Sequence, residues 1–398
     1  MKEVVIVGGL RTGMGSLGGG LASMPNHQMQ KIVFEELFKQ VPEVALDTID
    51  EAIVGCIGQG SDAPNIGRVA SQQAGVPIHV PACTIAMNCA SSMKAVSMAY
   101  ESIQVGEGEI YLIGGVESMS NIPYYLRKAR FGYRLNHGEL TDGLWEGLTC
   151  PMANQLMGRT AENLAEEFSI TREEQDKFAM ESHRKAFQAT RKGVYKEEIV
   201  TVHVPKKMAG KEVTPEPYAQ DENINIGLNM KYLAMYPTVF KKDGTVTPGN
   251  ACPISDAAAA AFIMTADKAK ELGLRPKARI LGYAYAALEP SRMGLGPAYA
   301  TPKVLKKLGM DIKDIDLIEL NEAFASQVIG CFRKFPFPQD IVNVDGGAIA
   351  LGHPVGFTGL RLLITMANKL VNRDKNVGLC TLCVGGGQGA AFIIERIN

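Results

Sequence analysis

The two ends of this chain repeat one order of sequence features at a nearly constant spacing. Four features near the N-terminus return near the C-terminus: two apolar runs, a turn before a helix, and a glycine pair after a strand. The pairs are Val4 with Ile280, Ile53 with Leu317, Cys89 with His353, and Gly114 with Gly385. Their separations all fall between 264 and 276 residues. Four matches in register predict two halves that are built alike.

Within each half, short apolar runs alternate with segments of helical spacing. The runs are Val4 to Val7, Ala52 to Ile57 and Ile110 to Ile113 in the first half, and Arg279 to Leu281, Ile315 to Ile318 and Gly378 to Val384 in the second. Helical spacing covers Gln28 to Lys39, Ser92 to Ser102, and a stretch that ends at Leu370. Short apolar runs are typical of strands buried on both faces. The pattern therefore predicts the α/β class with a mostly parallel sheet.

The segment between the halves breaks this alternation. Ala161 to Phe168 and Arg172 to Lys192 have helical spacing, and Thr171 with Glu174 forms a capping box at a helix start. Charged, proline-containing loops are expected around Pro205 to Asp221. We expect an N-terminal half over 1–120 and 250–272, an inserted loop domain over 121–249, and a C-terminal half over 273–398.

Composition excludes several classes of function. Lys plus Arg number 41 and Asp plus Glu 42, so the formal charge of −1 argues against general binding to nucleic acid or to an anionic membrane. The longest apolar run, Ala257 to Met264, is far shorter than the ~20 residues of a spanning helix. The chain opens on a strand-like run without a targeting segment, and its eight cysteines are expected to be free thiols. We therefore expect a cytoplasmic protein.

Two motifs match familiar patterns but lie in the wrong context. Gly13-x-Gly15-x-x-Gly18 satisfies the dinucleotide fingerprint, yet it does not follow a strand directly and no helix starts inside it. Cys380 and Cys383 form a CxxC, but they lie on an apolar strand, where residues three apart point to opposite faces. We expect a loop at the first motif and no metal or disulfide at the second.

Cys89 lies where an extended segment turns into a helix. A thiol at a helix N-terminus faces free N–H donors and the positive end of the helix dipole, which lower its pKa and favour a nucleophile. The neighbouring residues are small and leave room for a substrate. The alternative, a buried structural cysteine, is equally compatible with position alone.

Two polar residues in the second half are candidates to work with this thiol. His353 is the only histidine of that half and lies between Gly352 and Pro354, before a helix. It corresponds to Cys89 in the repeat, which makes it a better candidate base than an isolated histidine. Asn321 follows an apolar strand, and open α/β sheets carry their chemistry at strand carboxyl ends. Its amide suits binding of a water or of an oxyanion.

Taken together, these segments resemble the thiolase family, the acyl-CoA:acyl-CoA C-acyltransferases. The matching segments are ordered along the whole chain: Arg11-Thr12, Pro81 to Val96, Gly114 to Ser120, Met157 to Asn163, Lys242 to Thr247 with Gly249-Asn250, Asn321 to Ala325, Gly346 to Pro354, and Cys383 with Gly385 to Gly389. The resemblance implies a five-layered αβαβα fold of two duplicated βαβαβαββ halves, with a loop domain inserted in the first.

The resemblance also implies residue roles. Cys89 would carry the acyl group as a thioester, His353 would take its proton, and Cys383 would act as acid and base on the α-carbon of the second acyl-CoA. Asn321, through a water and with His353, would stabilise the thioester enolate. The backbone N–H groups of Cys89 and Gly385 would form the other oxyanion hole. Coenzyme A would be a co-substrate, with no permanently bound cofactor and no metal.

Several positions depart from the family pattern on the CoA and acyl sides. Cys252 replaces a serine that usually contacts pantetheine, Asn225 replaces a basic residue near the nucleotide, and Phe357 replaces a small residue. These departures predict an active enzyme with an unusual acyl group, which is bulky, branched or aromatic. The expected substrate- and CoA-binding residues are Met157, Phe240, Ala251, Cys252 and Phe324. Of these, Met157, Phe240 and Phe324 would form the acyl and pantetheine wall, although core packing accounts equally well for each of the three.

The leading hypothesis is therefore CoA-dependent thiolysis of a 3-oxoacyl-CoA, or the reverse Claisen condensation, by a ping-pong route. The alternatives are a biosynthetic acetoacetyl-CoA thiolase, a catalytically silent thiolase-like subunit of a hetero-complex, and a ketoacyl synthase, against which Cys383 speaks. We expect a homodimer or homotetramer, with Pro123 to Leu140 as a candidate contact segment. Acyl-CoA and CoA are the expected ligands, and an auxiliary subunit would compensate for weakened CoA binding.

Overall fold

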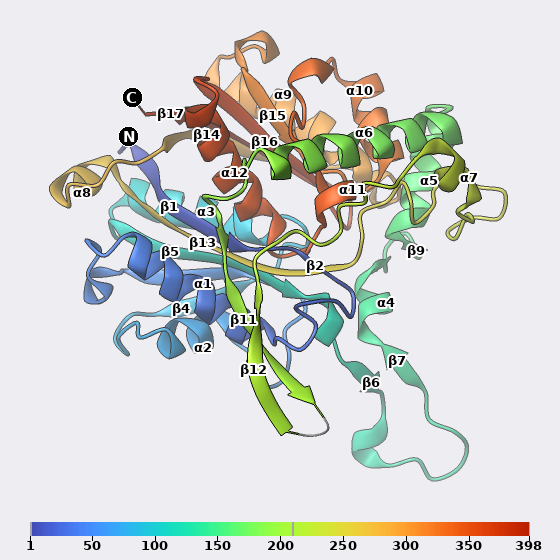
Figure 1. Ribbon diagram of the computed structural model, residues 1–398, viewed down its shortest axis with the longest axis horizontal. Helices are drawn as coiled ribbons and strands as arrows, with labels where there is room; N and C mark the ends of the chain where they lie inside the picture. Colours follow the sequence, from blue (N-terminus) through green and yellow to red (C-terminus); the bar gives the residue numbers. More distant parts are fainter. Residues whose placement is uncertain (1, 209–210, 398) are drawn as a thin grey trace.

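One large sheet of eleven strands runs through the molecule in the computed structural model, which describes residues 2–208 and 211–397 (Figure 1). Nine strands form its continuous path, in the spatial order β15 (Leu317–Leu320), β16 (Val377–Val384), β17 (Gln388–Arg396), β14 (Ala278–Ala287), β1 (Val4–Thr12), β13 (Ser255–Thr265), β5 (Ile110–Ser118), β3 (Glu51–Gly55) and β4 (Ala82–Ile85). The short strands β2 (Gly15–Ser16) and β10 (Ile199–Val200) pair with β13 and β1. Each expected apolar run overlaps a strand of this path, although the ends of two runs, Cys56 with Ile57 and Ile315 with Asp316, lie outside β3 and β15.

The sheet is mixed, so the expectation of a mostly parallel sheet is wrong. Only β15–β16, β5–β3 and β3–β4 are parallel neighbours on the path, whereas the five pairings in its middle are antiparallel. The reason lies in two connections. A tight glycine turn joins β16 to β17 as a hairpin, and β13 returns from the long excursion to lie between β1 and β5. Apolar runs alone do not distinguish strand directions.

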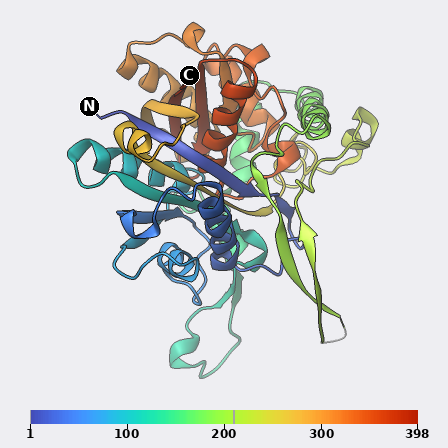
Figure 2. The same ribbon diagram turned by 60° about the vertical axis from the view of Figure 1, so that its left-hand side comes forward.

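The two halves of the sheet meet where β1 pairs with β14 over two residues, Val5 with Arg279 and Ile6 with Ala278. Helices α3 (Ser91–Val105) and α12 (Thr358–Asn372) pack between the half-sheets, where Met93, Leu363 and Phe392 share one buried cluster (Figure 2). The outer faces are covered by α1 (Asn26–Gln40) and α2 (Ile66–Gln73) on one side, and by α9 (Gly296–Leu308) and α10 (Ala325–Lys334) on the other. These five layers match the αβαβα expectation.

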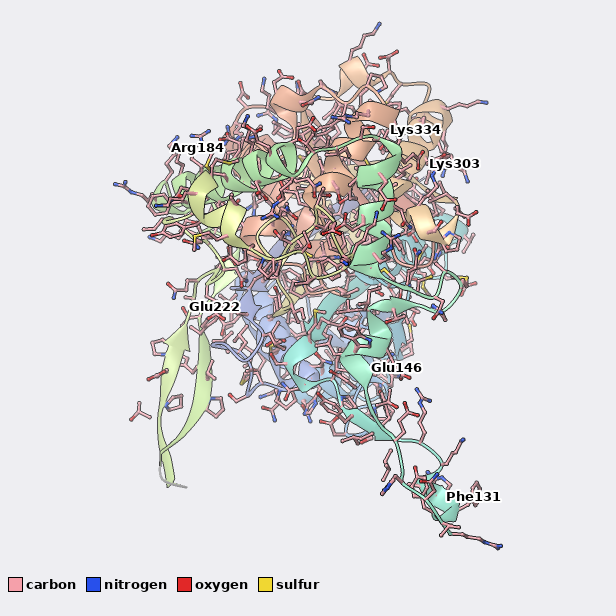
Figure 3. All side chains as sticks on the ribbon, turned by 90° about the vertical axis from the view of Figure 1, so that its right-hand side faces the viewer. Phe131, Glu146, Arg184, Glu222, Lys303 and Lys334 are labelled. Atoms are coloured by element: carbon pink, nitrogen blue, oxygen red, sulfur yellow. The ribbon has the colours of Figure 1, made fainter. Side chains whose placement is uncertain are left out.

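The excursion between the halves contains more β-structure than expected. Its elements are β6 (Tyr124–Leu126), β7 (Leu140–Asp142), α4 (Gly143–Gly147), β8 (Thr149–Cys150), β9 (Gln155–Leu156), α5 (Met157–Glu167), α6 (Arg172–Arg191), β11 (Val202–Met208), β12 (Lys211–Tyr218) and α7 (Met230–Met235). The loop expected around Pro205 to Asp221 is largely the β11–β12 hairpin, because Val202 and Tyr218 pair and are both buried. The β6–β7 hairpin projects as an arm with Phe131 near its tip (Figure 3).

Buried ion pairs tie the excursion to the first strand. Arg11 of β1 donates to Glu198 at 2.7 Å and to Asp221 at 2.6 and 2.9 Å, with the guanidinium fully buried. The capping box of Thr171 and Glu174 forms as expected at the start of α6. Two short helices, α8 (Ala266–Glu271) and α11 (Ala348–Leu351), complete the elements used below. The division of the chain into the three expected domains stays a prediction.

Among the described residues, no helix has the length and apolar character needed to cross a bilayer.

Candidate active site

Cys89 lies in a tight turn between β4 and α3. The turn is held by the Ser91 hydroxyl, which accepts from the Met87 N–H at 2.9 Å and donates to the Asn88 carbonyl at 2.7 Å. Asn88 has a φ of +45°, a left-handed conformation that asparagine tolerates better than most residues. The turn therefore presents the Cys89 side chain just ahead of the first turn of a central helix.

Two backbone N–H groups point at the Cys89 sulfur, one from Cys89 itself and one from Gly385 in the other half. Asn88 fixes this meeting, because its Nδ2 donates to the Gly385 carbonyl at 2.7 Å. The expected lowering of the thiol pKa is wrong: burial raises the pKa of Cys89 to about 11, although both N–H groups act in the opposite direction. Desolvation outweighs the helix terminus, so the free enzyme holds a neutral thiol.

His353 is buried between α11 and α12 and has a polar partner at each ring nitrogen. Its Nδ1 lies 2.6 Å from Thr358 Oγ1, and its Nε2 lies 3.4 Å from Asn321 Nδ2. Burial and, to a lesser degree, the nearby Arg361 cation lower the pKa of His353 to about 3. The imidazole is therefore neutral at pH 7, the form in which it can accept a proton.

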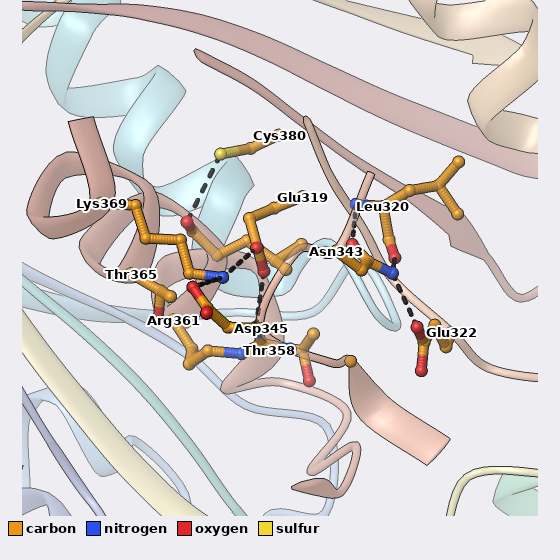
Figure 4. A network of polar contacts seen from close by, with 12 residues as sticks. Glu319, Leu320, Glu322, Asn343, Asp345, Thr358, Arg361, Thr365, Lys369 and Cys380 are labelled. Carbon is orange, nitrogen blue, oxygen red and sulfur yellow. Dashed lines mark hydrogen bonds and ion pairs between the residues drawn. The ribbon is translucent and has the colours of Figure 1, made fainter. Parts of the chain in front are cut away.

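Asn321 directly follows β15, and Asn343 clamps the residues on both sides of it. Leu320 N–H donates to Asn343 Oδ1 at 2.9 Å, while Asn343 Nδ2 donates to the Leu320 carbonyl and to Glu322, both at 2.8 Å (Figure 4). Asn343 also has a left-handed φ of +45°. Sequence reasoning missed Asn343, since its role depends on partners that lie over twenty residues earlier in the chain.

A network of buried charges involves α12, the helix that follows His353. Glu319 accepts from Lys369 at 2.6 Å and from Arg361 at 3.2 Å, and Lys369 also pairs with Asp345 at 3.1 Å (Figure 4). Arg361 and Lys369 project from α12, so the helix that follows His353 carries cations balanced by carboxylates from neighbouring segments. Buried charges of this kind are costly unless paired. The network fixes α12 and places a positive charge near His353.

Cys383 lies in one buried cluster with all five of the residues expected to bind substrate and CoA. One buried cluster contains Cys383 together with Met157, Phe240, Ala251, Cys252 and Phe324. Phe240 and Phe324 meet edge to face with ring centroids 6.1 Å apart. Burial raises the pKa of Cys383 well above its ordinary value, with Cys89 the next largest cause. Cys383 is therefore a protonated thiol close to Cys89.

Cys380 lies away from this cluster. It is buried in the central layer with Met93, and its Sγ contacts the Leu362 carbonyl. The expectation that Cys380 and Cys383 face opposite sides of their strand is confirmed. Within residues 2–208 and 211–397, no group of three or more His, Cys, Asp or Glu residues suits a metal ion.

A cavity of about 540 Å³ opens beside Cys89. Most of its wall is apolar and comes from the excursion and from the loops at the sheet ends; the larger apolar side chains are Ile57, Met119, Ile122, Tyr125, Leu144, Leu148, Met152, Met157 and Val355. Glu117 and Glu146 add two carboxylates. Phe357 is not among the lining residues; it is fully buried in the central layer, so the expectation that it shapes the acyl pocket is wrong.

Two further cavities follow one another from the buried cluster around Cys383, and the first of them is lined by Ala251 of that cluster. One, of about 140 Å³, is lined by Ala251 and Pro253 together with His183 and Asn225. The other, of about 460 Å³, shares Asn225, Leu228 and Tyr236 with it and is mostly apolar. A path of hollows thus runs from Ala251, next to Cys252, toward the surface at α7.

Comparison with known proteins identifies the family. A model described as the thiolase N-terminal domain matches residues 4–267, and one described as the thiolase C-terminal domain matches residues 274–396. The chain belongs to the thiolase family. An acetyl-CoA acetyltransferase of Pseudomonas aeruginosa is 42% identical to this thiolase over the full length of both chains. The expected family and fold are confirmed.

Solved structures agree with this assignment. The crystal structure of the Bacillus anthracis acetyl-CoA acetyltransferase has a TM-score of 0.95 at 40% identity, covering 100% of this chain and 99% of its own. That of human mitochondrial 3-ketoacyl-CoA thiolase in complex with CoA has a TM-score of 0.93 at 36% identity, covering 100% and 98%. The protein is thus a thiolase-family acyltransferase that uses CoA as a substrate, with thiolytic or condensation activity.

Proposed function

We propose that this thiolase cleaves a 3-oxoacyl-CoA with CoA, or runs the reverse condensation, through an acyl group carried on Cys89. The observation that carries the proposal is the meeting of residues from both halves: the N–H of Gly385 points at the Cys89 sulfur, with Cys383 close by and the Asn321–His353 pair in the second half. A silent subunit would have no need to keep the Cys89 sulfur, the Gly385 N–H and the Cys383 thiol together.

The first step is attack of Cys89 on the 3-oxo carbon. The thiol and the imidazole rest neutral, so His353 takes the thiol proton as the sulfur–carbon bond forms. The N–H groups of Cys89 and Gly385 stabilise the oxyanion that develops, and a donor of this kind is worth about 3 kcal/mol. The carbon–carbon bond then breaks and leaves the enolate of acetyl-CoA.

The second step is protonation of that enolate. Cys383 holds its proton firmly because of burial, and it delivers the proton to the α-carbon when the carbanion forms. Asn321 Nδ2 and His353, now protonated, stabilise the enolate oxygen. CoA then gives its thiol proton to the Cys383 thiolate and attacks the thioester on Cys89. The shortened acyl-CoA leaves, and the Cys89 thiolate takes its proton back from His353. In condensation the same residues act in reverse order.

We further propose an acyl group larger than acetyl. The cavity beside Cys89 has the volume of sites that enclose small organic ligands, about 300–1,000 Å³, and its wall is mostly apolar. The hollows from Ala251 toward α7 would receive CoA, where Asn225 offers no charge to a phosphate. The alternative of a biosynthetic acetoacetyl-CoA thiolase predicts no use for the large cavity.

A panel of short, long, branched and aromatic 3-oxoacyl-CoA esters tests the acyl group. We expect kcat/KM to rise from acetoacetyl-CoA to bulkier esters. Leu148→Trp fills the cavity and should lower kcat/KM for bulky esters at least about 10-fold while leaving acetoacetyl-CoA nearly unchanged. Val105→Trp, on an exposed residue at the far end of α3, is the matched control. A preference for acetoacetyl-CoA would favour the biosynthetic alternative.

Intact-mass measurement separates the enzyme from a silent subunit. Incubation with each thioester should add one acyl group to the wild-type chain and none to Cys89→Ala. The absence of an adduct with every ester would favour the silent subunit of a hetero-complex.

We also propose a homodimer or homotetramer. Exposed large apolar side chains gather on the β6–β7 arm, among them Leu126, Phe131 and Leu135. This gathering supports a contact with another chain, because a group of exposed apolar side chains is typical of an interaction surface. Light scattering of the purified chain tests this proposal, and micromolar CoA affinity of the chain alone would remove the need for an auxiliary subunit.

A further inference from the structure

Thr358, the first residue of α12, makes two short contacts through one hydroxyl. Its Oγ1 lies 2.7 Å from the Pro354 carbonyl and 2.6 Å from His353 Nδ1. The Thr358 side chain is fully buried, so no bulk solvent competes for either contact. The backbone N–H of Thr358 bonds to the same Pro354 carbonyl at 3.1 Å, which fixes the residue against the turn that carries His353.

A hydroxyl has only one proton to donate. The Pro354 carbonyl accepts and cannot donate, so the contact at 2.7 Å takes the Thr358 proton. Thr358 Oγ1 can then only accept from His353, which requires the proton of the neutral imidazole to lie on Nδ1. In this tautomer Nε2 carries a lone pair, and it faces the Asn321 Nδ2 donor at 3.4 Å.

The competing tautomer, with the proton on His353 Nε2, would give a hydrogen-bond partner to one more buried polar atom. Asn321 Oδ1 is buried and has no hydrogen-bond partner among the described residues. With the proton on His353 Nε2, rotation of the Asn321 amide would give Oδ1 that partner. An unpartnered buried acceptor is costly, so the pair alone favours the unreactive tautomer, in which Nε2 cannot take a proton from a thiol.

We propose that Thr358 is a positioning residue that holds His353 in the Nδ1–H tautomer and so keeps Nε2 available as the base for Cys89. This inference rests on the proposed function for the role of His353, but the tautomer itself is a property of the resting protein. Thr358 contacts no reacting atom. It acts through His353, and the unpartnered oxygen of Asn321 remains free for a substrate or a bridging water.

The test compares Thr358→Val with Thr358→Ser. Valine keeps the shape and removes the hydroxyl, whereas serine keeps the hydroxyl. Histidine-selective ¹⁵N labelling reads the tautomer at pH 7, with the His353 signals assigned by their loss in His353→Gln. We expect Nδ1–H in the wild type and in Thr358→Ser, and a shift toward Nε2–H in Thr358→Val.

Kinetics and alkylation give the second readout. Thr358→Val should lose at least about 10-fold in kcat and in the rate of Cys89 alkylation by iodoacetamide at pH 7, because the base is absent. Thr358→Ser should stay within a few-fold of the wild type on both. Melting temperature separates loss of folding from loss of the tautomer, since only the former would lower activity in proportion to the unfolded fraction.

Each outcome decides the proposal. An Nε2–H tautomer in the wild type overturns it without any variant. An unchanged tautomer in a folded but slow Thr358→Val overturns it too, as does a changed tautomer with full activity. If the wild type shows Nδ1–H and none of the thioesters reacts, the tautomer assignment stands while the proposed function fails.

Discussion

The two halves of this thiolase place residues of opposite chemistry at matching points. Cys89 precedes α3 and His353 precedes α12, and both helices lie in the central layer. Burial acts on both residues in the same sense, because it disfavours charge: it raises the pKa of Cys89 to about 11 and lowers that of His353 to about 3. One architecture thus holds both a neutral thiol and a neutral imidazole in the resting protein.

The surroundings of the two residues differ more than their positions. Cys89 borders an open cavity of about 540 Å³ and is held by backbone N–H groups. His353 is enclosed, held by two side chains and backed by the paired charges of Arg361 and Glu319. The first half thus leaves Cys89 open to a cavity, whereas the second half encloses His353 between two polar side chains.

Of the changes to the two halves, removal of the Cys89 thiol should have the largest effect on activity. Cys89→Ala is expected to lower thiolytic kcat at least about 10⁴-fold, because no other residue can carry the acyl group. Steady-state thiolysis of a preferred 3-oxoacyl-CoA measures this. Cys331→Ala, a buried thiol in the outer cluster of the second half, is the matched control and should keep activity. Comparable losses in both variants would mean that the thiols matter only for packing.

The depressed pKa of His353 predicts a stability difference at mildly acid pH. The folded pKa of about 3 lies below the ordinary 6.5, so the unfolded chain binds the proton first as pH falls. Stability is therefore lost as pH falls from 6.5 toward 3. Between pH 6.5 and 4.5 we expect the free energy of unfolding to fall by about 2 kcal/mol more in the wild type than in His353→Gln. Urea melts at both pH values measure this difference.

His183 does not contribute to this difference in the free energy of unfolding, because burial lowers its pKa to about 4 in the wild type and in the variant alike. Equal pH slopes would show that His353 is not held neutral by its surroundings.

The bond that joins the halves at the site should give the smallest effect. Asn88→Ala removes the donor to the Gly385 carbonyl and should lower kcat/KM about 5-fold, which corresponds to the loss of one hydrogen bond worth ~1 kcal/mol. Asn88 also has a positive φ, so Asn88→Gly removes the same donor without backbone strain. Similar losses in both variants support the role of the bond. Full activity in the glycine variant would assign the effect to strain.

The repeat and the starts of the main helices could be predicted from the sequence, because both depend on local patterns. It indicated α1, α3 and α6 close to their observed bounds. Three features could not be predicted from it: the strand directions in the middle of the sheet, the β11–β12 hairpin and the burial of Phe357 in the central layer. These depend on distant partners.

The same holds for the candidate site: features set by neighbouring residues could be predicted, and contacts between residues distant in the sequence could not. The helix-start argument anticipated N–H donors near Cys89, but it did not anticipate the donor from Gly385 in the other half or the larger effect of burial on the pKa of the thiol. Asn343 and Thr358 lacked any local signal, since each matters through a hydrogen bond to a residue whose own role had to be known first.

The convergence of both halves on one thioester is tested most directly by Cys383→Ala. Intact mass after addition of acetyl-CoA or a 3-oxoacyl-CoA measures acylation of Cys89. Transfer of the acyl group from acetyl-CoA to Cys89 should not require Cys383. Exchange of the α-protons of acetyl-CoA in D₂O uses Cys383. We predict that folded Cys383→Ala still acquires an acyl group on Cys89 from acetyl-CoA while α-proton exchange nearly disappears. Loss of both, or survival of both, would contradict the account.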